Sequence, residues 1–357
     1  MAHPDVQNRT PFVVEPLFIA DEDGRPIVAP IVKATLDVNA SGEVTLAEEQ
    51  IPVNFTGECY GEPGESSYRF EPETAFVKPT TDVVLVGHAH AHHSRATEVE
   101  VTFLVGFLKK AIRVMGDRHV EGGVQFGISR PKPFEKIPLT WERAFGGWDR
   151  SPEDPDQHTL EPRNPVGVGF VGSKGRVFEG SPLPNLEDPN HPLGAVGGKC
   201  KPVGFGFTSP NWYPRVSLAG TYDKAWSDSR APLLPKDFDR RFFNAAPEGL
   251  VSAQYLTGGE WVQVFNATGE GKWSFRLPGF ANPTCTAITK WGEERELIGN
   301  LDTVIVDSDL MQVQMIWRCF TPLRDGPLDL SSLKVECENA PEPVDVSTVE
   351  SGSGSLA

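Results

Sequence analysis

Hydrophobic residues follow a strand period over separate parts of the chain. Residues 12–52 contain three stretches rich in Val and Ile, which the turn-forming sequences DEDG and NASG separate. After a further strand-like run at residues 81–91, Glu98, Glu100 and Thr102 alternate with apolar residues, which is typical of a strand with one solvated face. Residues 260–320 return to strand character, with a hairpin candidate around 269–271. The pattern predicts a mainly β fold of antiparallel, sandwich-like lobes.

Residues 134–250 lack this period and are rich in aromatic residues, Gly and Pro. We expect long ordered loops here, because many buried rings offset the entropy lost when the backbone becomes ordered. The densest part is residues 211–247, which we expect to be functional, as long irregular segments in compact chains usually are. A few short helices fit: one turn at 139–147, with Thr140 as its N-cap and Gly146 at its end, and a modest helix at 235–246.

The length of 357 residues fits either two domains or one large β-rich unit. We predict a single domain over residues 1–337. Two β-rich lobes, at about 12–130 and 256–325, are one arrangement that the pattern allows, with the loop-rich aromatic segment 134–250 between them. The tail at residues 338–357, rich in Ser, Gly and acidic residues, is predicted to be disordered.

Charge and cysteine content narrow the classes of partner and compartment. The chain has 33 Lys and Arg against 49 acidic residues, a net charge of −16, which argues against nucleic acid and anionic membrane as ligands. Its first residues lack the basic segment followed by an apolar segment that is typical of a secretory signal peptide. No stretch reaches the roughly 18 apolar residues of a membrane-spanning helix. The five cysteines form no CxxC pair and are expected to be incidental thiols. We therefore expect a cytoplasmic protein.

Histidines gather in the sequence GHAHAHH. On an extended strand, His88, His90 and His92 would project from one face about 6.5–7 Å apart, a spacing that suits a first-row metal ion. A polar strand end is the simpler interpretation, because a further ligand such as Asp82, Asp117 or His119 would have to be brought to the histidines by the fold. We expect no bound metal, and a metal-dependent hydrolase that uses residues 88–93 is the alternative.

Other patterns typical of enzymes are weak. Asp237 and Asp239 could act as a glycosidase pair, but Arg240 and Arg241 follow directly, and ion pairing explains the carboxylates more simply. The chain has no GxSxG elbow, no P-loop and no dinucleotide-binding pattern after a strand. We therefore predict a protein that is not an enzyme and has no cofactor.

Several sequence blocks, in fixed order over most of residues 12–320, carry a family resemblance. Among them are TDVVLVGHA, IPLTWERAFGG, NPVGVGF, PVGFGF, WYPRVSLAGTYDKAW and RAPLLPKDFDRRFFNAAP. The chain resembles a bacterial family labelled as a domain of unknown function, whose genes typically lie beside those of type VI secretion spike proteins, PAAR-type tips and effectors. The resemblance implies an adaptor or chaperone that binds a type VI effector, a PAAR-bearing tip or a VgrG-type spike protein and helps to load it.

A loader of this kind needs a rigid surface with aromatic and Arg side chains that supply most of the binding energy. The residues that we predict to contact the partner are Trp212, Tyr213, Arg215, Tyr222, Trp226, Arg240 and Arg241, followed by Trp141, Arg143 and Phe145. The alternative is that these side chains serve only to fold the domain. A further alternative is that the protein is a structural part of the spike itself.

Overall fold

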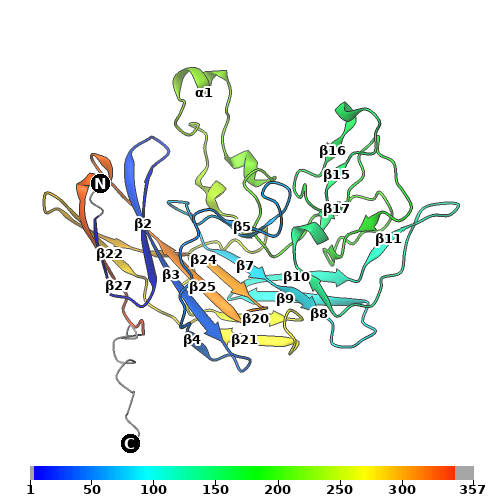
Figure 1. Cartoon of the computed structure of the whole chain (residues 1–357), viewed down its shortest axis with the longest axis horizontal. Helices are drawn as coiled ribbons and strands as arrows, with labels where there is room; N and C mark the ends of the chain where they lie inside the picture. The colour runs from blue at the N-terminus through cyan, green and yellow to red at the C-terminus, as the bar shows by residue number, and fades with distance from the viewer. Residues whose placement is uncertain (1–3, 342–357) are drawn as a thin grey trace, which may run out of the picture.

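The largest sheet of the molecule lies at the centre of the fold. The computed structural model describes residues 4–341 (Figure 1). The order of this sheet is β2 (Val13–Ala20), β3 (Pro26–Val38), β25 (Gln312–Arg318), β24 (Asn300–Asp307) and β7 (Asp82–Val86). The pairs are antiparallel except that β24 and β7 are parallel. Two short strands, β4 (Val44–Leu46) and β26 (Thr321–Pro322), also pair with β3.

A second, five-stranded antiparallel sheet is built around two hairpins. Its order is β19 (Leu186–Glu187), β10 (Leu108–Met115), β9 (Glu98–Val105), β20 (Trp261–Phe265) and β21 (Lys272–Arg276). In β9 the alternating apolar residues Val101, Phe103 and Val105 are fully buried, as the sequence pattern predicts. The β20–β21 hairpin forms where the turn at residues 269–271 places it. The hairpin predicted around residues 269–271 is therefore confirmed.

The remaining elements are a third sheet, a small three-stranded sheet, isolated strand pairs and short helices. The third sheet has the order β1 (Asp5–Asn8), β27 (Leu330–Glu336), β22 (Thr284–Thr289) and β23 (Glu294–Ile298). The other strands are β5 (Glu58–Cys59), β6 (Tyr68–Phe70), β8 (His88–His90), β11 (Arg118–Glu121), β12 (Gly127–Ile128), β13 (Lys136–Pro138), β14 (Phe145–Gly146), β15 (Trp148–Asp149), β16 (Thr159–Leu160), β17 (Val168–Gly169) and β18 (Pro182–Leu183). The helices are α1 (Lys224–Ser229) and the 3-10 turns η1 (Trp141–Arg143), η2 (Pro155–Gln157), η3 (Arg215–Leu218), η4 (Arg240–Phe243) and η5 (Gly326–Asp329).

The main core draws on both β-rich parts of the chain. Each large sheet combines strands from residues 12–130 with strands from 256–325, because β3 pairs with β25 and β9 pairs with β20. One cluster of buried apolar side chains accordingly runs from Phe12 to Val335. The predicted class, mainly β with antiparallel sheets, long ordered loops and a few short helices, is confirmed.

The short helices differ in detail from the sequence prediction. The turn after Thr140 is η1, which ends at Arg143 rather than at Gly146, and the Thr140 side chain makes no capping hydrogen bond. The helix expected at 235–246 is wrong in extent. Only η4 forms, because the Asp239 carboxylate accepts a hydrogen bond from the backbone N–H of Arg241 and so starts the helical turn at Arg240. Of the tail predicted to be disordered, residues 342–357 lie outside the described residues.

Candidate functional site

Residues 211–247, here called the arm, leave the body of the molecule and return to it (Figure 1). Helix α1 lies at the far end of the arm, and Asp223 caps it by accepting a 2.8 Å hydrogen bond from the backbone N–H of Trp226. Nearer the body, the backbone N–H and the hydroxyl of Thr221 donate to the Asp237 carboxylate at 3.0 and 2.7 Å. These bonds join the outgoing and returning segments of the arm at the base of its tip, which we define as residues 221–237.

The first end of the arm is fixed by Arg215. Its guanidinium donates to the carbonyl oxygens of Phe242 and Thr208, each at 2.7 Å, and forms an ion pair with Glu71. It also lies over the Phe242 ring at 5.2 Å from the ring centre. Because Phe242 belongs to the returning part of the arm, a single buried side chain ties both ends of the arm to each other and to the body.

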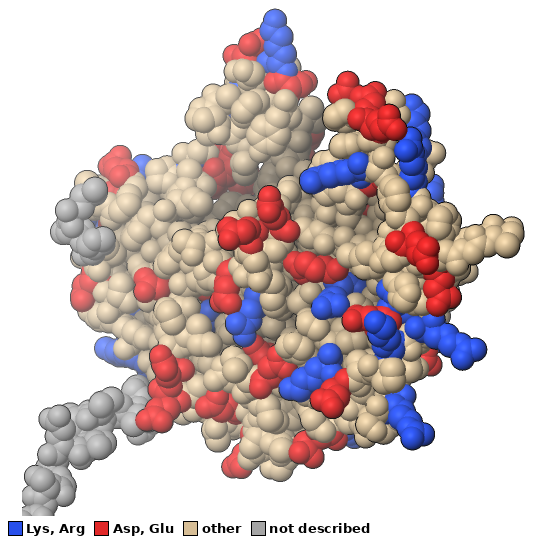
Figure 2. Space-filling view, turned by 45° about the vertical axis from the view of Figure 1, so that its right-hand side comes forward, with Lys and Arg blue, Asp and Glu red and all other residues tan. Residues whose placement is uncertain are grey.

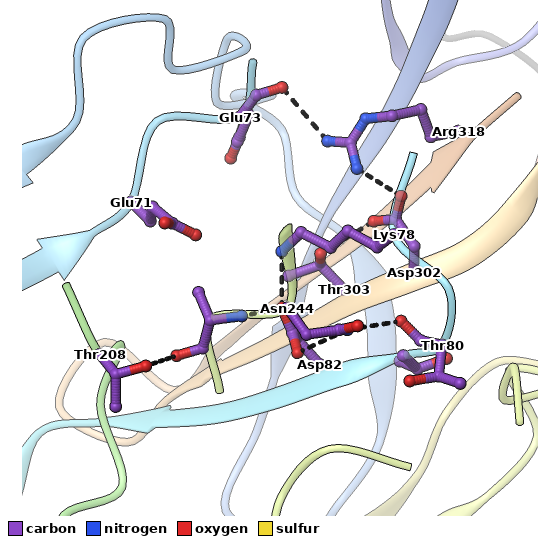
Figure 3. A network of polar contacts seen from close by, with 12 residues as sticks. Glu71, Glu73, Lys78, Thr80, Asp82, Thr208, Asn244, Asp302, Thr303 and Arg318 are labelled. Atoms are coloured by element: carbon purple, nitrogen blue, oxygen red, sulfur yellow. Dashed lines mark hydrogen bonds and ion pairs between the residues drawn. The ribbon is translucent and has the colours of Figure 1, made fainter. Parts of the chain in front are cut away.

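The second end of the arm is fixed by Asp82, the first residue of β7. Its buried carboxylate accepts hydrogen bonds from the Asn244 amide at 3.0 Å, from the Ala245 backbone N–H at 2.8 Å and from the Lys78 ammonium at 2.7 Å. Asn244 also donates to the carbonyl oxygen of Thr80 at 3.0 Å. Figure 3 shows Asp82 and Asn244 close together, with Lys78 and Thr80 beside them. The central sheet therefore holds the returning end of the arm directly.

These contacts belong to a larger buried polar network, which consists of four ion pairs. The pairs are Lys33 with Glu73, Lys78 with Asp82, Arg215 with Glu71 and Arg318 with Asp302. Every side chain in them is less than one-tenth exposed. Their charges cancel, and Arg318 links two pairs by donating to the Glu73 carbonyl oxygen at 3.2 Å (Figure 3).

Burial sets the electrostatics of this buried polar network. Burial raises the pKa of the Glu71 carboxyl, and the positive charge of Arg215 opposes that effect. The pKa of Asp302 is raised for the same reason, with Arg318 opposing. Burying an ion pair adds little stability, but removing one partner from it costs about 3–5 kcal/mol. The main role of the network is therefore to determine where the arm attaches, and its contribution to the net free energy of unfolding is small.

The side of the arm contacts the turn between β2 and β3. Arg230 donates to the backbone carbonyl of Glu22 at 2.9 Å and to the Asp23 carboxylate at 2.8 Å. Arg240 forms an ion pair with Glu22 at 2.6 Å and lies 5.7 Å from the centres of the Phe76 and Phe320 rings. Arg240 is a predicted partner-binding residue and Arg230 is not, yet both contact the same turn and support the arm from one side.

The ten predicted partner-binding residues divide into two groups. Four are buried, namely Trp141, Phe145, Trp212 and Arg215. The Trp141 and Trp212 rings meet edge to face at 5.8 Å, and the Trp141 indole N–H donates to the Gly206 carbonyl. Phe145 lies in a small separate core cluster. These four contact the protein's own interior, so we do not include them in a docking surface.

The other six predicted residues are at least partly exposed. Tyr213 and Tyr222 are 52% and 54% exposed, and the Tyr222 ring contacts that of Trp226 at 4.7 Å. Trp226 itself is half-buried, because its indole N–H donates to the Leu233 carbonyl. Arg241 is exposed and pairs with Asp239. The remaining two are Arg143 and Arg240.

Figure 2 shows the arm as one of two projections on this face of the molecule, with a hollow between them. The visible surface of the arm is mostly uncharged, and its Lys and acidic residues gather at the tip. The structure thus places a partly aromatic projection, held at both ends, in contact with solvent.

The histidines of residues 88–93 do not converge on one point. His88 pairs with Asp309 at 2.7 Å, whereas His92 contacts the Asn266 amide oxygen at 3.0 Å. Burial lowers the pKa of His90, and the nearby Lys136 lowers it further. Within residues 4–341, no group of three or more His, Cys, Asp or Glu side chains is placed to hold a metal ion.

Sequence reasoning missed the residues that hold the arm. Glu71, Asp82 and Asn244 were not among the predicted site residues, although Asp82 opens an otherwise apolar strand. Lys33 likewise interrupts the apolar run of β3 and is almost fully buried. A charged residue inside an apolar strand is the one sequence feature that indicates a buried ionic partner.

Comparison with known proteins gives one match. The family model described as an uncharacterized protein conserved in bacteria (DUF2169) matches residues 23–318, which is most of the chain. Neither the curated proteins nor the solved structures contain a match to the chain. Over residues 4–341, none of the helices has the length and apolar character needed to cross a membrane.

Proposed function

This chain belongs to the DUF2169 family, and we propose that it is an adaptor that binds another protein through the arm at residues 211–247. The observation that carries the proposal is the attachment of the arm. The buried ion pair of Arg215 with Glu71 fixes one end, hydrogen bonds from Asn244 and Ala245 to the buried Asp82 carboxylate fix the other, and Tyr213, Tyr222 and Arg241 remain exposed. A surface that is already ordered loses little entropy on binding, and exposed Tyr and Arg side chains are typical of binding hot spots.

We further propose that the partner is a type VI secretion effector, or the PAAR-type or VgrG-type protein that carries it, and that binding takes place in the cytoplasm. The support is the resemblance of the ordered sequence blocks. Two of those blocks, WYPRVSLAGTYDKAW and RAPLLPKDFDRRFFNAAP, form the outgoing and returning parts of the arm.

A metal-dependent hydrolase is favoured less. The described residues bring His88 and Asp309 together as a pair but supply no third ligand to them. Elemental analysis of the purified protein tests this alternative. About one zinc or iron per chain, lost on His90→Ala with His92→Ala, would support the hydrolase instead.

The adaptor proposal is tested by co-purification. The tagged chain is co-expressed with the effector or tip protein encoded beside it, and we expect the two to elute together. Tyr222→Ala with Arg241→Ala should reduce the retained partner about tenfold or more. Phe107→Ala is the matched control, because Phe107 is a fully exposed aromatic residue in the turn between β9 and β10. Failure to retain any neighbouring gene product, or an equal loss with Phe107→Ala, would contradict the proposal.

A further inference from the structure

A cleft of about 280 Å³ lies beside the attached ends of the arm. Its walls come from β10, from the segment that begins at Lys201, from the outgoing arm at Tyr213 and Pro214, and from the chain just after the arm. It is thus bounded partly by the arm and partly by the body of the protein.

The cleft is positively charged in a protein of strongly negative net charge. Its positively charged lining residues are Lys109, Lys110, Arg163 and Lys201, and its negatively charged ones are Asp188 and Glu248. Two of the four cations already have carboxylate partners: Lys201 pairs with Glu248 at 2.7 Å, and Arg163 pairs with Glu161, which is outside the cleft, at 2.6 Å.

Lys110 has a different environment. Its ammonium donates to the backbone carbonyl of Glu248 at 2.8 Å, and among residues 4–341 no carboxylate lies within ion-pairing distance of it. Burial lowers the pKa of Lys110 to about 8. A lysine ammonium has three donors, so two remain for a ligand. A half-buried cation with spare donors favours an incoming anion, because the anion restores the stabilisation that water no longer supplies.

The other walls are apolar and rigid. Pro202, Pro214 and Pro247 line the cleft together with the half-exposed ring of Tyr213 and the buried Trp141. Proline and aromatic walls suit the backbone and apolar side chains of an extended peptide. Such walls would add little to the binding of a small inorganic anion, which needs hydrogen-bond donors on several sides.

We propose that this cleft binds a carboxylate of an acidic segment of the partner protein, with Lys110 as the central cation and Tyr213 packing against the neighbouring residue of that segment. The inference rests on the proposed adaptor function and specifies the partner chemistry at the base of the arm. In an overall acidic protein such a site adds selectivity, because a cleft with an excess of positive charge attracts an acidic segment that negatively charged surface repels.

A labelled peptide of sequence GELELG serves as the probe, with GQLQLG as its uncharged match, and binding is followed by fluorescence anisotropy. We expect the acidic peptide to bind more tightly, and Lys110→Gln to weaken its binding at least about tenfold. Lys201→Gln should weaken it as well. Lys174→Gln is the control for charge, since Lys174 is exposed and does not line the cleft. Melting temperatures show that each variant is folded.

Three results would overturn the inference. They are equal affinity for the two peptides, equal loss with Lys174→Gln, and full displacement of the peptide by sulfate at equal concentration, which would identify a site for small anions. The partner protein then separates the two proposals. If Tyr222→Ala with Arg241→Ala lowers partner affinity but Lys110→Gln does not, the adaptor function stands and the cleft inference fails. If Lys110→Gln lowers partner affinity tenfold, the inference is supported.

Discussion

The carboxylate of Asp82 accepts a 3.0 Å hydrogen bond from the side-chain amide of Asn244, a residue 162 positions later in the chain. Asp82 is fully buried at the start of β7, in the central sheet, whereas Asn244 lies where the arm rejoins the body. This bond therefore connects the central sheet to the part of the chain that we propose to bind a partner. Its energetic consequences can be measured.

Removing the Asp82 carboxylate should destabilise the protein strongly. In Asp82→Ala the Lys78 ammonium stays buried without its partner, and we expect a loss of about 3–5 kcal/mol in the free energy of unfolding. Urea denaturation measures this loss. Asp228→Ala, at an exposed position in the tip, should change the same quantity by less than about 0.5 kcal/mol. A loss below about 1 kcal/mol for Asp82→Ala would mean that the network does not hold the arm.

The pair of Arg318 and Asp302 should show strong coupling. Arg318→Met alone leaves the Asp302 carboxylate buried without a cation, so it should cost about 3–5 kcal/mol. Arg318→Met combined with Asp302→Leu removes both charges and should recover at least about 1 kcal/mol of that loss. A double-mutant cycle in urea gives the coupling energy. Additive losses would show that the two charges act independently.

Arg215 should control the order of the arm. In Arg215→Lys the positive charge opposite Glu71 remains, but an ammonium cannot reproduce the planar set of bonds to Phe242 and Thr208. We expect trypsin to cleave within the tip several-fold faster than in the wild type, as fragment masses would show. Arg241→Lys is the control, because Arg241 is exposed and pairs with its near neighbour Asp239. Equal cleavage rates in both variants would contradict this role.

The depressed pKa of Lys110 predicts a pH dependence of stability. Its folded-state pKa of about 8 lies below the ordinary lysine pKa of 10.5, so the unfolded chain binds more protons between these two pH values. The free energy of unfolding of the wild type should therefore increase from pH 8 to pH 10.5 relative to that of Lys110→Met, which lacks the ammonium group. The charges that act on this amine are Glu248, Lys201 and Asp188. Paired denaturation curves at pH 7.5 and 9.5 test the sign, and a constant difference between the two proteins would contradict it.

The strands were predictable from sequence because their alternation directly reflects which face is buried. Val101, Phe103 and Val105 of β9 illustrate this rule. In the arm no such period exists, and adjacent residues differ completely: Trp212 is 3% exposed and Tyr213 is 52% exposed. Only tertiary contacts, such as that between the Trp212 and Trp141 rings, decide which of the two is buried.

The attachment of the arm could not be predicted for a related reason. Glu71, Asp82 and their partners Arg215 and Asn244 lie far apart in sequence, and nothing local pairs them. Helix α1 was missed although Asp223 is a good N-cap residue, because a helix of six residues shows too little periodicity to be recognised. Sequence patterns thus predict the sheets, and the site depends on contacts between distant segments.

We propose that the ordered arm provides the docking surface. The Thr221–Asp237 contact closes the base of the tip, so residues 222–236 can be replaced by two glycines in the full chain without separating the ends. Isothermal titration compares how tightly the wild type and this variant bind the protein encoded beside the chain. We expect the wild type to bind, the variant to bind at least about tenfold more weakly, and the melting temperature to change little. Unchanged affinity in a folded variant would show that the tip is not part of the docking surface.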